Sequence, residues 1–238
     1  VRVGRRPRVA VISTGDEVLP ADTPRSGLLP GKIRDINRFT LAGQVVEAGG
    51  VPGDSRWVED DLDVLVERCA AALNDHDVVL RSGGSSVGAR DFTIEILKHL
   101  PEAELLVHGI AVRPGKPTIL ARVGRKVFWG LPGQPVSALM IAKVFVRPSL
   151  WRLQGRWVAG SSGDGVRASL SCRLPSVHGR TDFVPVTLAH TGKAKVATPV
   201  FGKSAMIGML TRADGYLVIP AHVEGLDQGA EVTVQLFP

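Results

Sequence analysis

The sequence predicts a layered α/β domain with a mostly parallel sheet, followed by a small all-β, barrel-like domain. Over residues 1–153, short apolar runs alternate with segments of helical periodicity, which is typical of strand–helix–strand units. Beyond a Gly- and Ser-rich stretch at 155–165, apolar residues recur at about every second position, as in strands with one buried face. We therefore expect two domains, 1–153 and 154–238.

The expected elements of the first domain follow in order along the chain. Residues 9–12 are a continuous apolar run, which indicates a strand buried on both faces. The stretch 20–33 holds three Pro and two Gly and is expected to be a loop. The further expected strands are 51–58, 77–80, 105–107, 118–121 and 127–129; the expected helices are 35–48, 60–73, 92–100 and 136–153.

Three local signals support these helices. Gly49 and Gly50 end the first helix, where a left-handed residue is favoured. Residues 62–73 place apolar side chains at a spacing near 3.6 residues, which indicates one buried helix face. Pro148 is expected to interrupt the last helix. In the second domain the expected strands are 166–171, 183–188, 196–200, 217–219 and 232–237, which fits a small barrel or sandwich.

Net charge and aromatic content indicate which kinds of molecule the chain could bind. The net charge is +6, with 29 Lys and Arg against 23 Asp and Glu; this indicates either an ordinary basic surface or attraction of anionic ligands. The only dense basic run lies within residues 2–8, and aromatic residues make up 5% of the chain. Stacking platforms for nucleic acid are therefore scarce, and we expect no nucleic-acid partner, although an oligonucleotide-binding β-domain is the rival interpretation.

Cysteine content and hydropathy indicate the compartment. Cys69 and Cys172 are far apart and without a metal-ligand pattern, so no disulfide framework or zinc site is expected. Cys69 lies on an apolar helix face and is expected in the core. No signal peptide is visible and no run of about 18 apolar residues occurs, so we expect no membrane association and a cytoplasmic protein. Val1 begins so close to a strand-like run that we expect the chain to be part of a longer protein.

The stretch 82–88 is the most informative part of the sequence. It reads Ser-Gly-Gly-Ser-Ser-Val-Gly, follows an apolar strand, and is followed by Asp91. A flexible, hydroxyl-rich turn before a helix directs backbone N–H groups at one point, which suits an anion, and Asp91 could hold a metal ion or a proton. It lacks the Gly-Lys-Ser/Thr of a Walker loop, and an ordinary glycine turn is the alternative.

Other turns carry charges that could serve the same site. The turn 13–17 places Asp16 and Glu17 after the first strand, as Mg²⁺ ligands or a general base, or with Thr14 or Asp16 as a local cap. Asp60 and Asp61 open a helix and are either a cap or site residues. The turns after the first and third strands meet at the carboxyl ends of parallel strands, where ligands bind in such sheets, so we expect one shared site.

Two proline-bounded turns complete the set. Residues 113–117 read Arg-Pro-Gly-Lys-Pro and bring two cations to a rigid turn, either to grip an oxyanion or as a plain surface turn. Residues 131–135 read Leu-Pro-Gly-Gln-Pro and precede a helix, with Pro135 suited to its first position. The six histidines show no spacing of metal ligands or of a catalytic triad.

Taken together and in this order, the motifs resemble the molybdopterin molybdenumtransferase family, the MoeA and gephyrin E-domain group. The matching stretches are 13–17, 35–38, 82–92, 113–117 and 131–137. The β-rich tail is similar to the C-terminal domain of that family, at 204–206, 212–215 and 219–220. The family's two N-terminal domains have no counterpart in this chain.

The resemblance implies an activity and its site. Family members insert molybdate into adenylylated molybdopterin and release AMP, with the help of Mg²⁺. The implied catalytic and metal-binding acids are Glu17, Asp60 and Asp91. The implied substrate-binding residues are Asn37, Ser82, Gly83, Gly84, Ser86, Gly88, Arg113, Lys116, Pro117, Pro132, Gly133, Pro135, Ser137 and Ser204. The resemblance also implies a homodimer and contacts with other proteins of molybdenum cofactor biosynthesis.

Several positions depart from the family pattern. Ser85 stands where Val is usual, Gln134 and Asp214 where Asn is usual, Gly109 where many members carry Lys, and Pro185 near a frequent Arg. Lost cations would weaken oxyanion binding, since a hydrogen bond to a charged group contributes about 1.5–3 kcal/mol. The alternative function is therefore a catalytically degenerate paralogue that binds the pterin or acts as a scaffold.

Overall fold

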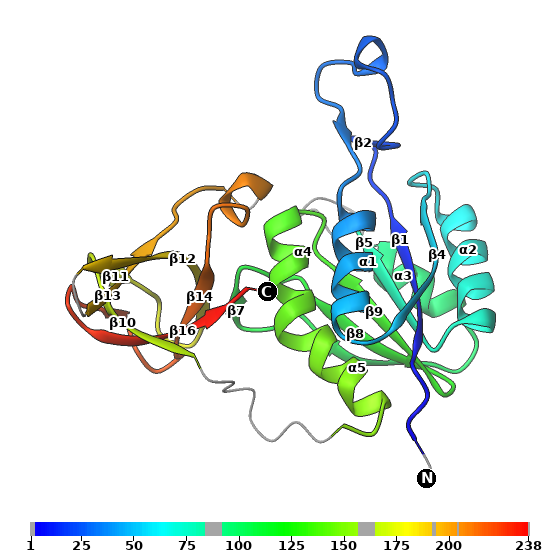
Figure 1. The fold of residues 1–238 in the computed structure, drawn as a ribbon. Helices are drawn as coiled ribbons and strands as arrows, with labels where there is room; N and C mark the ends of the chain where they lie inside the picture. Colours follow the sequence, from blue (N-terminus) through cyan, green and yellow to red (C-terminus); the bar gives the residue numbers. More distant parts are fainter. Residues whose placement is uncertain (1–2, 84–91, 157–164, 192–193, 204, 238) are drawn as a thin grey trace. The chain divides into compact units, whose positions relative to one another are not determined.

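The computed structural model describes residues 3–83, 92–156, 165–191, 194–203 and 205–237. They form two compact units (Figure 1). The first unit contains the described residues up to 110 and those from 117 to 156, and the second contains 111–116 and the residues from 165 onward. The segment 111–116, expected in the first domain, thus belongs to the second unit. None of the helices in the described residues combines the length and apolar character that crossing a bilayer requires.

The first unit is built on a six-stranded sheet with the order β4-β1-β5-β9-β8-β6. The first four strands are parallel and the last two pair antiparallel, which confirms the expected mostly parallel sheet. The strands are β1 (Arg8–Ser13), β4 (Val51–Trp57), β5 (Val78–Ser82), β6 (Ala103–His108), β8 (Ile119–Val123) and β9 (Lys126–Leu131).

Helices cover both faces of this sheet. Figure 1 shows α1, α4 and α5 over one face and α2 and α3 over the other. The helices are α1 (Asn37–Glu47), α2 (Leu62–Asp75), α3 (Phe92–His99), α4 (Pro135–Ile141) and α5 (Arg147–Leu153). Between α4 and α5 the chain forms a π-helical segment, Ala142–Val146. The expected long helix is therefore interrupted near Pro148, as predicted, because the π-helical segment ends two residues before this proline, which lacks the N–H of a regular α-helical hydrogen bond.

The core explains why β1 is apolar along its whole length. Val9, Ala10, Val11 and Ile12 are all buried, because the sheet is covered on both faces. Ala10 and Ile12 pack in a cluster with side chains of α2 and α3. The expected residues on α2, Cys69 among them, line the buried face of that helix.

Cys69 should be unreactive in the folded protein. It is fully buried, and this burial raises the pKa of its thiol to about 12, outweighing the opposing effect of Arg81. Because the thiolate is the reactive form, we expect an aromatic disulfide reagent at pH 8 to modify only Cys172, which is half-buried. Both thiols should react in denaturant. Modification of Cys69 in native protein at the rate of Cys172 would contradict the packing of α2.

The expected loop 20–33 is an arm that projects beyond the carboxyl end of β1 (Figure 1). Short strands β2 (Val18–Leu19) and β3 (Ile33–Arg34) pair in parallel at its base, and a 3-10 turn, Arg25–Gly27, lies within it. Two backbone bonds close the base, from the Ile33 N–H to the Glu17 carbonyl (2.8 Å) and from the Asp35 N–H to the Leu19 carbonyl (2.7 Å). The arm therefore returns the chain to the end of β1 before α1 begins.

Asp77, between α2 and β5, should make stability depend on pH. Partial burial acts to raise the pKa of the Asp77 carboxyl. Hydrogen bonds from the Arg8 backbone N–H and the Arg5 side chain act in the opposite direction, as do the charges of Arg5 and Lys126. The pKa of Asp77 is lowered overall. A lowered carboxyl pKa stabilises the fold above the pKa of the unfolded chain, and this contribution is lost as pH falls through the folded-state pKa.

We therefore expect Asp77→Asn to lower the free energy of unfolding at pH 7 and to have progressively less effect below about pH 4, near the ordinary aspartate pKa. Urea titrations at several pH values measure this difference. Asp63→Asn, in the first turn of the same α2 helix, is the control for losing one negative charge. A stability loss for Asp77→Asn that is equal at acidic and neutral pH would contradict the expectation.

The second unit is a closed barrel. Its strands are β10 (Val166–Leu170), β12 (Thr181–Thr191), β13 (Ala194–Pro199), β14 (Gly215–Ile219) and β16 (Glu231–Leu236). They follow the order β13-β10-β16-β14-β12, and pairing of β12 with β13 closes the ring. A further strand, β7 (Val112–Arg113), pairs in parallel with β12. Short strands β11 (Leu174–Pro175) and β15 (Gly225–Leu226) and a 3-10 turn, Ile207–Met209, complete the unit.

Candidate functional site

The sheet of the first unit has a position where the chain reverses its direction of winding. From β1 the chain passes through α1 to β4 on one side, and then through α2 to β5 on the other side. In open α/β sheets the connections that leave the two strands at such a point turn to opposite faces of the sheet, and ligands bind in the crevice outside the strand ends. Here that point lies between Ser13 at the end of β1 and Ser82 at the end of β5, and the Thr14 N–H donates to the Ser82 carbonyl (2.9 Å).

Glycines allow three strand ends to approach one another there. Gly83 has a φ of +112°, and a Cβ atom at this position would lie 1.9 Å from the Thr14 carbonyl oxygen. A Cβ atom on Gly133, after β9, would lie 3.3 Å from the Cα of Gly83. Both positions therefore bring bare backbone to the crevice, and Gly83 tolerates no side chain.

Asn37, at the start of α1, links these strand ends. Its Nδ2 donates to the Ser82 hydroxyl (2.8 Å) and to the Gly133 carbonyl (2.7 Å). The Ser82 hydroxyl in turn donates to the Pro132 carbonyl (3.0 Å). The Oδ1 atom of Asn37 is buried and accepts no hydrogen bond from the residues that the structure describes, and Asn37 also lines a small cavity of about 20 Å³.

This hydrogen-bond network limits the ability of Ser82 to donate a hydrogen bond to a substrate. The side chain is fully buried, and its single O–H is already donated to Pro132. Direct donation to a substrate phosphate would require breaking that bond, because a hydroxyl has only one proton to give. In the described structure Ser82 holds Asn37 and the segment after β9 in place.

Asp35 forms a second buried contact, which the sequence had not singled out as part of the site. Its Oδ1 accepts hydrogen bonds from the Ser13 hydroxyl (2.9 Å) and from the Arg38 N–H (3.2 Å). Its Oδ2 lies 3.6 Å from Nε of Arg38. Asp35 is the first residue of the matching stretch 35–38, but it was not among the site residues that the resemblance implied. Asp35 fixes the start of α1 against the end of β1.

The structure separates the roles of the paired acids before α2. Asp61 is the helix cap, since its Oδ1 accepts the Val64 N–H at 3.0 Å. Asp60 instead accepts the hydroxyl hydrogen bond of Thr14 at 2.9 Å. Asp60 therefore does not cap the helix, and its hydrogen bond with Thr14 holds its carboxylate beside the end of β1. Thr14, one of the expected local caps of the turn 13–17, uses its hydroxyl for this contact instead.

Carboxylate oxygens suited to Mg²⁺ are present at this edge of the sheet. Glu17 is exposed and lines the small cavity together with Thr14, whose hydroxyl contacts Asp60. Within the described ranges no three His, Cys, Asp or Glu residues form a group that could hold a metal ion. The third expected acid, Asp91, lies outside the described residues, as do Gly84, Ser86, Gly88 and Ser204.

Arg81, in β5, is a buried cation whose burial the sequence did not predict. Its side chain is fully buried, and its guanidinium donates to the Gly83 carbonyl (2.9 Å) and to the Thr93 hydroxyl (2.7 Å). Gly83 precedes residues 84–91 and Thr93 follows them in α3. The guanidinium thus ties the end of β5 to the first turn of α3.

The expected cationic turn lies in the second unit. Arg113, on β7, and Lys116 are exposed. NH1 of Arg113 lies 3.9 Å from Oδ2 of Asp182, a buried carboxylate to which Arg180 donates two hydrogen bonds (2.7 and 3.1 Å). This ion group and the β7–β12 pairing anchor the segment 111–116 to the barrel. The expected convergence of Glu17, Asp91 and Lys116 on one pocket stays a prediction.

The remaining expected residues flank β8 and the end of β9. Pro117 is exposed and precedes β8, whereas Pro132 is buried directly after β9. Pro135 is the first residue of α4, as expected, and Ser137 is buried within that helix. Pro132 and Pro135 therefore shape the crevice edge, and the structure brings Pro135 and Gly133 into the same small cavity as Asn37.

Comparison with known proteins matches both units. Residues 10–152 match the family described as "Probable molybdopterin binding domain", and residues 167–237 match the "MoeA C-terminal region (domain IV)". The chain is 31% identical over 240 residues to a molybdopterin molybdenumtransferase of Bacillus subtilis, covering 100% of this chain and 54% of that protein. A Haemophilus influenzae protein of the same name is 30% identical over 248 residues, covering 58% of its length.

Solved structures agree with these matches. A molybdopterin biosynthesis MoeA protein of Pyrococcus horikoshii superposes with a TM-score of 0.80 at 38% identity, over 98% of this chain and 55% of that one. A second structure with that name gives a TM-score of 0.77 at 28% identity. The chain spans about half the length of the curated relatives it matches. The chain belongs to the molybdopterin-binding domain family, joined to a C-terminal domain of the MoeA type.

Proposed function

We propose that this chain is the catalytic C-terminal part of a molybdopterin molybdenumtransferase, which inserts molybdate into adenylylated molybdopterin and releases AMP. The observation that carries the proposal is the presence of both family matches, in this order, along one chain. The crevice between β1, β5 and β9 supports it, because bare glycine backbone and paired carboxylates suit an anionic guest with a divalent cation.

In this proposal, different residues bind the phosphate, the metal ion and the oxyanion. Gly83 and Gly133 give a phosphate close access to backbone, and Asn37 holds those strand ends together. Glu17 and Asp60, with Asp91, would hold Mg²⁺, and the bound ion would offset negative charge on the pyrophosphate. We assign binding of the molybdate and phosphate oxyanions to Arg113 and Lys116, and we include Ser204 in this role on the family resemblance alone. We further propose a cytoplasmic homodimer that exchanges substrate with other proteins of cofactor biosynthesis.

The test uses the full-length protein that contains this chain. Incubated with Mg²⁺, molybdate and adenylylated molybdopterin, it should release AMP and retain molybdenum on the pterin product. Glu17→Gln should slow AMP release by at least about 100-fold, as expected when an essential metal ligand is lost. The matched control is Glu104→Gln, at an exposed carboxylate on β6 that pairs with Arg122. No AMP release by the unmodified protein would overturn the proposal.

The degenerate paralogue remains the second candidate, and the backbone at Gly109 bears on it. Gly109 has a φ of +79° and donates its N–H to the Thr118 carbonyl (2.9 Å). Lysine at this position would be strained, so the missing cation follows from the local backbone, and Gly109→Lys is not expected to increase turnover. Tight pterin binding by calorimetry together with zero AMP release would favour this candidate.

A further inference from the structure

His76 is a buried titratable residue that the proposed reaction does not use. It caps the C-terminus of α2, and only 4% of its surface is exposed. Its ring Nδ1 lies 2.9 Å from the carbonyl oxygen of Ala72, one turn earlier in α2. Its Nε2 lies 3.2 Å from the backbone nitrogen of Asp54, which is 22 positions earlier and belongs to β4. The imidazole therefore connects the end of α2 to a strand of the sheet.

The contact with β4 falls at a bulge in that strand. The register of β4 against β1 shifts between Val9 and Val11, so that two residues of β4, Gly53 and Asp54, face a single residue of β1. A bulge disrupts the hydrogen-bond ladder at that point, and here the Asp54 N–H is directed at the imidazole. Gly53 makes room for the ring, because a Cβ atom at this position would lie 1.9 Å from Nε2 of His76.

These two contacts accept only the neutral imidazole. A backbone N–H can only donate, so Nε2 must accept from Asp54 and must carry no proton. Nδ1 then carries the single ring proton and donates it to the Ala72 carbonyl. An imidazolium carries a proton on each nitrogen, so its Nε2–H would face the Asp54 N–H, donor against donor. Such a clash leaves buried donors without acceptors, which is costly.

The charged groups around His76 do not offset this cost. The carboxylate of Asp54 is paired with Arg56, with Nε to Oδ1 at 2.8 Å and NH2 to Oδ2 at 2.6 Å. The carboxylate of Asp77 has the cationic and backbone partners described above. Lys126 donates from Nζ to the His76 carbonyl at 2.8 Å, so the charge nearest to this residue along its backbone is positive and opposes a second one.

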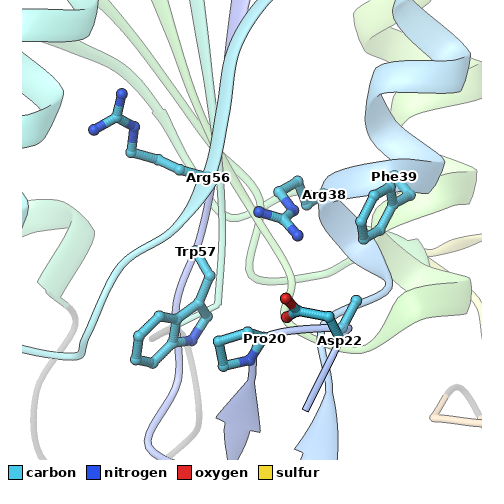
Figure 2. Close-up of a pocket in the computed structure, with 7 residues that line it drawn as sticks. Pro20, Asp22, Arg38, Phe39, Arg56 and Trp57 are labelled. Carbon is cyan, nitrogen blue, oxygen red and sulfur yellow. The ribbon is translucent and has the colours of Figure 1, made fainter. Parts of the chain in front are cut away.

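We propose that His76 is an acid-sensitive latch, which holds the bulged edge strand β4 to α2 while the ring is neutral and releases it when the ring is protonated. β4 lies at the edge of the sheet, and its last residues, Arg56 and Trp57, line a cavity of about 520 Å³ together with Asp22 of the arm and Phe39 of α1 (Figure 2). Release therefore loosens one wall of this cavity. A histidine in a released strand titrates near pH 6.5, which sets the working range.

Hydrogen exchange of the full-length protein, followed by mass spectrometry, tests the latch without any substrate, so its outcome is independent of the proposed reaction. Protection is expressed relative to the free-peptide rate, which removes the ordinary pH dependence of exchange. We expect the protection of residues 53–57 to fall about tenfold between pH 7.5 and pH 5.5, because protonation favours the released strand. Residues 78–82 of the central strand β5 should keep their protection. The effect of Asp77 appears at lower pH and does not overlap this range.

The tautomer of the ring is a second measurement on the unmodified protein. With ¹⁵N-labelled histidine, the NMR signals of His76 at pH 7.5 should show a protonated Nδ1 and a bare Nε2. A neutral ring with its proton on Nε2 would overturn the proposal. Protection of β4 that does not change between pH 7.5 and pH 5.5 would overturn it as well.

Variants assign the effect to this residue. His76→Gln retains a side-chain oxygen that can accept from Asp54 but no group that is protonated in this range, so the protection of β4 should no longer depend on pH. Gly53→Ala displaces the ring, and its β4 should already show low protection at pH 7.5. The matched control is His99→Gln, at an exposed position at the end of α3, which should keep the tenfold fall. A tenfold fall that persists in both His76→Gln and Gly53→Ala would exclude the latch.

Discussion

Replacing Gly83 with alanine is expected to destabilise the first unit by about 3 kcal/mol or more. The added Cβ would lie 1.9 Å from the Thr14 carbonyl oxygen, and the residue would have to keep a φ of +112°. Neither partner can yield easily, because the Thr14 N–H and the Ser82 carbonyl are hydrogen-bonded at the same strand ends. Urea titration followed by circular dichroism measures the loss, as a lower midpoint with an unchanged slope.

Gly31→Ala separates the steric effect from the backbone effect. Gly31 also has a positive φ (+84°), but nothing lies within 4 Å of the Cβ that alanine would add. We expect this variant to lose only about 1–2 kcal/mol, the cost of left-handed backbone in an L-residue. If both variants lost the same amount, the close approach of β1 and β5 at Gly83 would not be what requires glycine there.

Changing Asn37 to aspartate is the second substitution with a large expected effect. The two side chains have the same shape, but aspartate cannot donate, so its oxygens would face the Gly133 carbonyl and the Ser82 hydroxyl at the positions now held by Nδ2. The Gly133 carbonyl would lose its donor, and the single proton of the Ser82 hydroxyl could serve either the new carboxylate or the Pro132 carbonyl, but not both. This shortage of donors around a buried charge should lower the free energy of unfolding by about 2–4 kcal/mol at pH 7.

The same variant predicts a pH signature. Protonation of the introduced carboxylate would restore one O–H donor, so the stability difference between Asn37→Asp and the parent should shrink as pH is lowered. Asn74→Asp, at an exposed position of α2, is the matched control and should change stability by less than about 0.5 kcal/mol. An Asn37→Asp protein as stable as the parent at neutral pH would show that the network of Asn37 does not hold the strand ends together.

Much of the first unit could be predicted from the sequence because the responsible signals are local. The apolar run 9–12 is confirmed as the buried strand β1, and the 3.6-residue spacing after Asp61 is confirmed as α2. Gly49 has a φ of +78° and ends α1, as its position predicted. Each of these outcomes depends on interactions between residues a few positions apart, so the order of residues is enough to determine them.

Site details were harder to predict because they join residues far apart in the chain. Nothing in the pair Asp60 and Asp61 reveals which acid caps the helix, since the choice depends on the Thr14 hydroxyl 46 positions away from Asp60. Arg81 directly follows the apolar run 78–80, and nothing nearby in the sequence indicates that its charge is buried; its partners, the Gly83 carbonyl and the Thr93 hydroxyl, are known only from the structure.

The sequence by itself determined the two classes of domain, the positions of most helices and strands, and the glycine- and acid-bearing turns at strand ends, since periodicity and turn chemistry are encoded in neighbouring residues. Only the tertiary structure decided that 111–116 pairs with the barrel, that Asn37 bridges the ends of β5 and β9, and that Trp57 and Asp22 share a cavity. These contacts depend on which strands lie side by side, and that follows from packing of the whole core.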